Sequence, residues 1–132
     1  MSDSSVLDGV STVFPAVPAS AAAARRFVGA ALCRWEVAPD VAELARLLTS
    51  ELITNACRHA GSRARVSVVQ QPETVRVEVY DSGGGRVRVR HPQPEQQGGR
   101  GLHIVDTLAS RWGSRASEGG TLVWFELPTG AR

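Results

Sequence analysis

The sequence predicts an α+β fold, a two-layer sandwich in which helices cover one face of a mixed, mainly antiparallel sheet. Two observations predict it. Apolar residues recur at helical spacing over residues 20–60, and after Gly61 they alternate with polar residues at the period of a β-strand. At 132 residues the chain is long enough for one domain with a hydrophobic core and too short for two.

Two helices account for most of the first half of the chain. The first is predicted over residues 20–35, where the apolar positions at helical spacing are Ala24, Phe27, Val28, Ala31, Leu32 and Trp35. The second is predicted over residues 41–60. Asp40 and Glu43 stand three residues apart at its start, as in a capping box, and Gly61 is typical of a helix end.

Strands account for much of the second half. Valines alternate with polar residues over residues 65–68 and 75–80, on either side of a turn near Gln71 and Pro72, which indicates an antiparallel hairpin. Residues 121–127 are rich in β-branched and aromatic side chains, so we expect the chain to close on a strand.

The remaining segments are predicted to be irregular, apart from one short helix. Residues 1–17 are Ser-rich without a period, so we expect a loose N-terminal arm before a single domain over residues 18–132. A short edge strand at the end of that arm is left open. The Gly- and Pro-containing stretch 82–101 is predicted to be a long mobile loop, and a third helix is expected over residues 102–110.

The composition excludes several classes of protein. All 15 residues counted as Lys plus Arg are Arg, whereas a P-loop and a eukaryotic-type protein kinase each need a Lys at the nucleotide phosphates. The net charge of +2 is too small to indicate nucleic acid by itself. No run approaches the roughly 20 apolar residues that span a membrane, and residues 1–18 lack the pattern of a signal peptide. We therefore expect a cytoplasmic location, with Cys33 and Cys57 as reduced structural thiols.

A polar line runs along the edge of the apolar stripe of the second predicted helix. Glu51, Asn55 and His59 are four residues apart and share one side. The neighbouring apolar stripe consists of Val41, Leu44, Ala45, Leu48, Leu52 and Ala56. Polar groups tilted toward a core need partners, which are either each other and the backbone or a bound ligand. Cys57 and Arg58 are expected on the outer arc of the same helix.

Two Gly-rich segments follow the hairpin. Asp81-Ser-Gly-Gly-Gly85 places an acid at a strand end, which suits either an ordinary turn or a carboxylate that accepts a hydrogen bond from a base. Gly98-Gly-Arg-Gly-Leu102 leads into the third predicted helix, so it is either a flexible hinge or a phosphate cradle at a helix N-terminus.

In order and spacing, these segments resemble the motifs of the GHKL ATPases and kinases. The segments similar to the N box, the G1 box, the G2 box and a further Gly-Thr element are residues 51–60, 81–85, 99–102 and 120–121. The resemblance covers nearly the whole chain. Within that superfamily the chain is most similar to bacterial anti-sigma factors that are serine kinases, through Glu51-Leu-Ile-Thr-Asn55 and the short ending from Gly119 to Pro128.

The resemblance implies a Bergerat fold that binds ATP and Mg²⁺. Asn55 would coordinate Mg²⁺. Asp81 would accept a hydrogen bond from the adenine amino group, with Thr121 beside it through water. Glu51 would be the catalytic base, drawing the proton from an attacking serine hydroxyl.

The other motif residues would surround the phosphates. His59 and Arg100 would contact phosphate oxygens. The residues that would shape the pocket and its lid loop, at about 86–100, are Gly83, Gly85, Gly99, Gly101 and Leu102.

The resemblance leads to a first functional hypothesis and leaves alternatives. The chain would be an ATP-dependent serine/threonine kinase that phosphorylates an anti-sigma factor antagonist and sequesters a sigma factor, with a homodimer implied. The alternative is a catalytically weak switch that acts by ATP-dependent protein contact. A detached histidine kinase half is disfavoured because no helical hairpin with an acceptor His precedes the domain. Direct nucleic-acid binding is disfavoured because the Arg residues of 86–90 lack interleaved aromatics, and no membrane association is expected.

Overall fold

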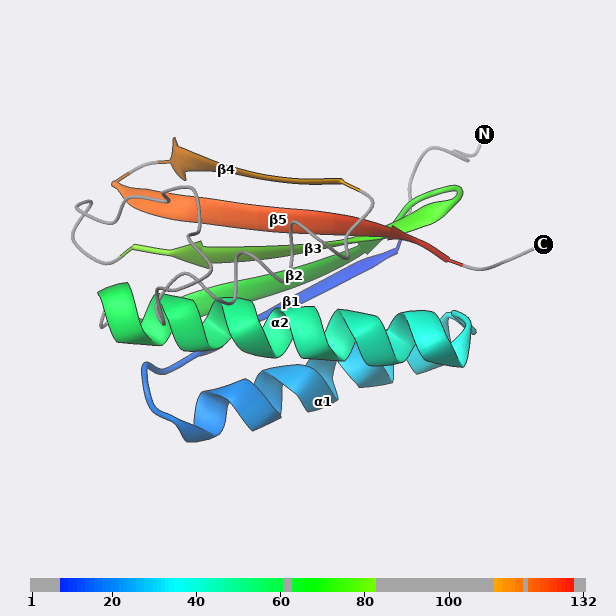
Figure 1. Cartoon of the computed structure of the whole chain (residues 1–132), viewed down its shortest axis with the longest axis horizontal. Helices are drawn as coiled ribbons and strands as arrows, with labels where there is room; N and C mark the ends of the chain where they lie inside the picture. The colour runs from blue at the N-terminus through cyan, green and yellow to red at the C-terminus, as the bar shows by residue number, and fades with distance from the viewer. Residues whose placement is uncertain (1–7, 61–62, 83–110, 118, 130–132) are drawn as a thin grey trace, which may run out of the picture.

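A computed structural model describes residues 8–60, 63–82, 111–117 and 119–129. The elements, in chain order, are β1 (Gly9–Phe14), α1 (Ala19–Arg34), α2 (Pro39–Ala60), β2 (Ala64–Gln70), β3 (Thr74–Asp81), β4 (Arg111–Ser117) and β5 (Gly120–Pro128). They form two layers, a twisted sheet and a pair of helices (Figure 1). The predicted α+β sandwich is confirmed.

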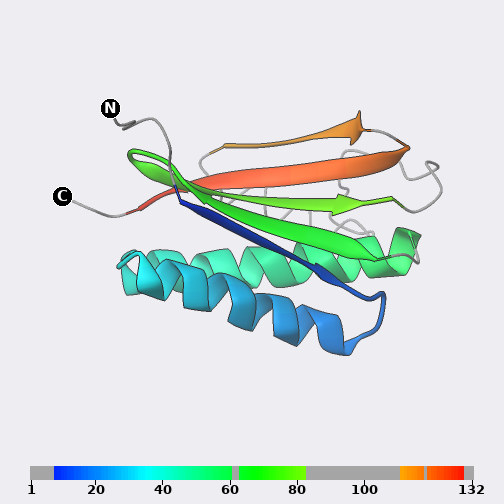
Figure 2. The same ribbon diagram turned by 180° about the vertical axis from the view of Figure 1, so that it is seen from behind.

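The five described strands form one sheet in the order β1-β2-β3-β5-β4, and every neighbouring pair is antiparallel. Both described helices lie on the same face of this sheet, as the view from behind also shows (Figure 2). α1 packs on β1 and β2, whereas α2 packs on β2, β3 and β5. Neither of the two is long and apolar enough to cross a membrane.

The core lies between the layers because the strands alternate. In β3, Val75, Val77 and Val79 are buried toward the helices, and the residues between them point to the other face. Phe125 on β5 lies directly opposite Val77 and is fully buried. Burying these side chains against the helices removes apolar surface from water, which stabilises the sandwich.

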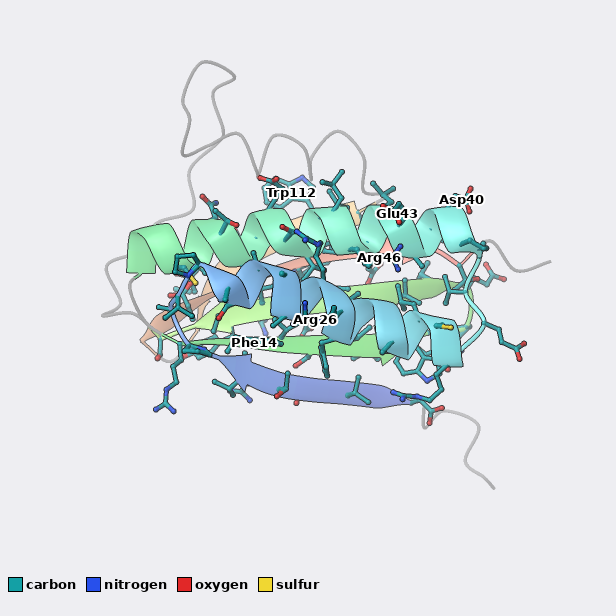
Figure 3. The ribbon with its side chains drawn as sticks, turned by 90° about the horizontal axis from the view of Figure 1, so that it is seen from below. Phe14, Arg26, Asp40, Glu43, Arg46 and Trp112 are labelled. Carbon is teal, nitrogen blue, oxygen red and sulfur yellow. The ribbon has the colours of Figure 1, made fainter. Side chains whose placement is uncertain are left out.

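The two helices approach closely at a glycine. Gly29 of α1 faces the side chain of Arg46 on α2, and a Cβ at this position would lie 3.0 Å from the Arg46 Cδ and Nη1 atoms. Nearby, the guanidinium of Arg25 donates a hydrogen bond of 3.2 Å to the hydroxyl of Ser50. α2 is therefore buried on two sides, by the sheet beneath it and by α1 beside it (Figure 3).

The elements with strong periodicity match their predictions. The helices predicted over residues 20–35 and 41–60 are α1 and α2, with boundaries shifted by one or two residues. The predicted hairpin is β2 and β3, which are joined by a turn that includes Gln71 and Pro72. The predicted closing strand is β5.

Two strands differ from the sequence analysis. Residues 9–14 lie in the segment expected as a loose arm, but they form the edge strand β1. Such a strand was considered possible from the sequence but was not predicted. Ladder hydrogen bonds to β2 order this segment despite its polar neighbours. β4 was not predicted, since it has few apolar residues, and its pairing with β5 places it at the other edge of the described sheet. The third predicted helix and all but the first residue of the long loop 82–101 lie outside the described residues.

Candidate functional site

A buried acid lies at the end of β3. Asp81 occupies the same face as Val75, Val77 and Val79, and only 4% of its surface is exposed. Apolar residues fill the stripe up to this point, so a carboxylate here replaces the next core side chain. A buried carboxylate is costly unless polar groups meet it, and for this reason its position marks a candidate binding site.

Thr121 lies beside Asp81 across the sheet. The two residues are directly opposite each other on β3 and β5, and opposite residues in an antiparallel pair have Cβ atoms about 5 Å apart on the same face. Thr121 is also 4% exposed. Although the two residues are far apart in sequence, the sheet places a carboxylate and a hydroxyl together on the helix-covered face.

Gly120 allows this close approach. A Cβ atom at Gly120 would overlap the carbonyl oxygen of Asp81 and would lie 2.9 Å from both the Asp81 carbonyl carbon and the Ser82 Cα. Only a residue without a side chain fits at the start of β5. Gly120 was not among the predicted site residues, although its place directly before Thr121 in the Gly-Thr element was a signal.

Glu51 and Asn55 share the flank of α2 that is turned away from α1. Arg46 and Ser50 contact α1, and positions five residues further along a helix point to a different side by about 140°. Glu51 and Asn55 are each half-buried, and neither side chain hydrogen-bonds another residue in the described part of the chain. Two polar groups thus lie partly covered beside the core without a described partner.

The last turns of α2 lie at the same end of the sandwich as Asp81. α2 ends at Ala60, and Ala64, four residues later, pairs with Asp81 in the sheet. Asn55 lies in these last turns. The structure therefore gathers the predicted metal ligand and the predicted adenine acceptor at one end of the molecule.

Cys57 requires a correction. It was expected on the outer arc of the helix, but it is partly buried against the core, and its Sγ lies 4.0 Å from the carbonyl oxygen of Pro15. Burial, and after it the negative charge of Asp81, raise the pKa of the Cys57 thiol, while a hydrogen bond with the Val17 backbone opposes them.

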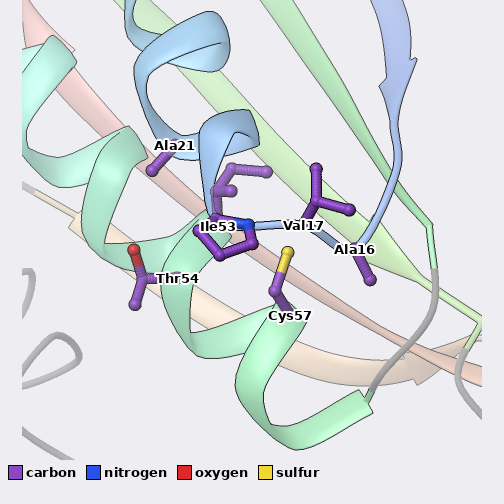
Figure 4. A pocket seen from close by; sticks show the side chains of 7 residues that line it. Ala16, Val17, Ala21, Ile53, Thr54 and Cys57 are labelled. Atoms are coloured by element: carbon purple, nitrogen blue, oxygen red, sulfur yellow. The ribbon is translucent and has the colours of Figure 1, made fainter.

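A cavity of about 410 Å³ opens beside Cys57, on the α1 side of α2 (Figure 4). Its lining is mostly apolar and consists of Ala16, Val17, Pro18, Ala21, Ile53, Thr54 and Cys57. Glu51 and Asn55 do not line it, and neither do Asp81 and Thr121. The cavity is therefore separate from the polar candidate site, with α2 between them.

Several predicted site residues lie outside the described structure. His59 belongs to α2, but its side chain is not described. The others outside the described residues are Gly83, Gly85, Gly99, Arg100, Gly101 and Leu102. The described part of the candidate site thus consists of Glu51, Asn55, Asp81, Gly120 and Thr121.

Several solved structures share this fold, and two of them illustrate it. One contains the RsbU and RsbW domains of Rv1364c from Mycobacterium tuberculosis, with a TM-score of 0.69 and 17% identity over 91% of this chain. This chain spans 32% of the length of that structure. The other is the catalytic domain of the histidine kinase ThkA in a nucleotide-free form, with a TM-score of 0.52 and 20% identity over 67% of each chain.

The family assignment comes from the sequence. No curated protein matches the chain. The family model of the histidine kinase-like ATPase domain matches residues 14–127, which include every element from α1 to β4 and nearly all of β5. ATP is the nucleotide that this family implies. With the sheet of five described strands, the two described helices on one face and the buried acid at the end of β3, the match shows that the chain belongs to the histidine kinase-like ATPase domain family.

Proposed function

We propose that this protein binds Mg²⁺-ATP at the Asp81 end of the sandwich and uses it as a serine/threonine protein kinase of the anti-sigma factor type. Its substrate would be an anti-sigma factor antagonist, and its regulatory target would be a sigma factor. The observation that carries the proposal is the buried Asp81 beside Thr121, at the same end as the polar flank of α2.

Asp81 provides selectivity for adenine. Its carboxylate accepts a hydrogen bond from an exocyclic amine, and it repels the carbonyl oxygen that guanine carries at the corresponding position. Burial strengthens this discrimination because water cannot compensate for a mismatched group. The Thr121 hydroxyl supplies a second polar group beside the same base edge, and Gly120 keeps the β5 backbone close to Asp81.

The donor set on α2 fits a hard cation. Asn55 offers an amide oxygen on the polar flank, and Mg²⁺ binds a few oxygen ligands of this kind together with phosphates and water. The bound cation would offset negative charge on the phosphates during transfer. We assign Asn55 as the cation ligand because the resemblance to the N box gives it that role.

Glu51 is the proposed catalytic base. It lies one helical turn before Asn55 on the same side, half-buried, so it would face a hydroxyl brought to the phosphate end of the nucleotide. Its carboxylate would take the proton as the serine oxygen attacks the terminal phosphorus, and ADP would leave. His59, Arg100, Leu102 and the glycines of both Gly-rich segments would line the phosphates.

The partners rest on similarity. The motif order resembles that of anti-sigma factor serine kinases, and a structure that includes an RsbW domain shares the fold. We extend the same inference to a homodimer and to a cytoplasmic location.

Nucleotide binding is tested by calorimetric titration of the purified protein with ATP, ADP and GTP, each with and without Mg²⁺. We expect Mg²⁺-dependent binding of ATP and no binding of GTP at the same concentration. Asp81→Asn should weaken ATP binding at least tenfold, whereas Asp40→Asn, at the exposed start of α2, should not. If Asp81→Asn binds ATP as well as the parent, the placement of the adenine is wrong.

Catalysis is tested separately, with radiolabelled ATP and a serine-bearing antagonist protein. Glu51→Ala should leave ATP affinity within about twofold and abolish transfer, because the base acts in the transition state and not in binding. Glu43→Ala, two turns earlier on an exposed position, is the matched control. If the parent binds ATP but transfers no phosphate, the alternative hypothesis of an ATP-dependent binding switch would take the place of the kinase hypothesis.

A further inference from the structure

The sheet has a second face that no described element covers. Both α1 and α2 lie on the other side (Figures 1 and 2), and the strand registers assign the outward residues to three rows that cross the sheet. The first row is Val13, Arg65, Tyr80, Leu122 and Arg115; the second is Ser11, Ser67, Glu78, Trp124 and Gly113; the third is Gly9, Val69, Arg76, Glu126 and Arg111. We call this surface the open face.

In the second and third rows the charges are paired. The guanidinium of Arg76 lies 2.7 Å from Glu78 and 3.0 Å from Glu126, and it stacks 4.0 Å from the centre of the Trp124 ring. Arg111 lies 3.6 Å from the other carboxylate oxygen of Glu126. Two arginines are thus matched by two glutamates, and Glu126 is almost fully buried among them.

The first row differs, since it has two arginines and no acid. Arg65 and Arg115 are both exposed, and among the described residues neither forms an ion pair. Tyr80 and Leu122 lie between them. At the usual strand spacing, the Arg65 and Arg115 backbones are about 14 Å apart. The net positive charge of the open face therefore comes from Arg65 and Arg115, on either side of Tyr80 and Leu122 in one row.

We propose that the open face binds an acidic segment of a partner protein, laid across the strands along the row from Arg65 to Arg115. Charge complementarity favours an acidic occupant, because Arg65 and Arg115 form no ion pair with the described residues. Two acidic side chains about four residues apart in an extended peptide span about the same 14 Å, and the half-buried Tyr80 ring would cover part of the peptide between them, above the buried Leu122.

Two other occupants fit less well. A single-stranded nucleic acid needs free aromatic faces for stacking, whereas Arg65 lies 5.6 Å from the centre of the Tyr80 ring and Arg76 covers Trp124. A second copy of the chain would bring the same unpaired arginines to the interface from both sides, which is repulsive. This inference does not depend on nucleotide binding, because the open face and the Asp81 site lie on opposite faces of the sheet.

The test is a fluorescence anisotropy titration of the full chain with a labelled ten-residue poly-glutamate peptide, at two salt concentrations. We expect binding that weakens as salt rises, and at least a tenfold loss of affinity in the double variant R65E/R115E. The double variant R26E/R34E changes the net charge equally on the exposed side of α1, and it should bind within about twofold of the parent. Unchanged ATP binding and circular dichroism would show that R65E/R115E is folded, and R65Q/R115Q is the substitute if it is not.

Four results would overturn the proposal. The first is no peptide binding by the parent, and the second is an equal loss of affinity in both double variants. The third is tighter binding of a ten-nucleotide poly-dT probe, with the same dependence on Arg65 and Arg115. The fourth is a dimer, detected by analytical ultracentrifugation, that R65E/R115E dissociates. The third result would assign the open face to nucleic acid and the fourth to a second copy.

Discussion

The two ends of the sandwich are built differently. At the end that holds the β2–β3 turn, which we call the hairpin end, backbone groups are closed by hydrogen bonds. The backbone N–H of Gln71 donates a hydrogen bond of 2.9 Å to the carbonyl oxygen of Thr74. The backbone N–H of Thr129 donates one of 3.1 Å to the carbonyl oxygen of Glu73, and the backbone N–H of Ala38 donates one of 3.2 Å to the carbonyl oxygen of Thr129. The turn, the residue before α2 and the residue after β5 are thus joined to one another by backbone hydrogen bonds.

The opposite end, which we call the Asp81 end, contains buried polar side chains instead. Asp81 and Thr121 are both nearly inaccessible, Glu51 and Asn55 are half-buried, and a partly buried thiol lies near Asp81. At the hairpin end, therefore, backbone groups hydrogen-bond to one another, whereas at the Asp81 end polar side chains lie against the core. The difference indicates that the hairpin end is built for stability and the Asp81 end for a ligand.

The largest expected effect is that of Gly120→Ala. The new Cβ would overlap the Asp81 backbone, which cannot rotate away as a side chain could, so the start of β5 must shift. We expect about 3 kcal/mol of lost stability, measured by urea denaturation, together with loss of ATP binding. Gly9→Ala on β1 meets its nearest atom at 3.4 Å, an ordinary contact, and should change stability by less than about 1 kcal/mol. Similar losses in both variants would contradict the special role of Gly120.

Thr49→Val tests whether burying a polar group away from the Asp81 end has a cost. Thr49 lies midway along α2, fully buried, and its hydroxyl has no hydrogen-bond partner among the described residues. Replacing the hydroxyl with a methyl group should raise stability by about 1 kcal/mol. Ser50→Ala removes a hydroxyl that Arg25 does reach, so it should lower stability slightly. A loss of stability in Thr49→Val would mean that the hydroxyl is satisfied.

Thr74→Ala separates stability from function at the hairpin end. The Thr74 hydroxyl donates a hydrogen bond of 2.7 Å to the Gln71 side chain and closes the turn between β2 and β3. Its removal should cost about 1 kcal/mol in a thermal or urea melt and leave ATP affinity unchanged. A marked change in ATP affinity would show that the two ends are coupled through the β3 strand.

The predictable part of the fold is the part with clear periodicity. α2 and β3 bury one regular face each, so their apolar residues recur at the periods of a helix and a strand. β4 has no such pattern, because its residues are mostly polar and Gly113 interrupts them. It is held by pairing with β5 and by the Trp124 ring, which lies over Gly113. β5 follows β4 directly in the sequence, but its pairing and its Trp124 ring leave no apolar period in the residues of β4 itself.

The candidate site was predictable only in part for the same reason. Glu51 and Asn55 could be placed on one side of a helix from their spacing, but the pairing of Asp81 with Thr121 depends on the register of β3 and β5, which local patterns do not contain. Cys57 was placed wrongly because the helix was assumed to have one buried side. α1 covers a second side, and Cys57 lies on it beside Val17 and Ile53.

The smallest expected effect concerns the reactivity of Cys57. Because burial and the charge of Asp81 raise the pKa of this thiol, less thiolate is present at a given pH and alkylation by iodoacetamide should be slow. In a Cys33→Ser background, which removes the exposed thiol, Asp81→Asn should lower the pKa of Cys57, so that its pH–rate profile moves to lower pH and its alkylation at pH 8 becomes faster. Asp40→Asn at the hairpin end should leave the profile unchanged. An unmoved profile in Asp81→Asn would mean that burial alone suppresses the thiolate and that Asp81 does not act on the α1 side of α2.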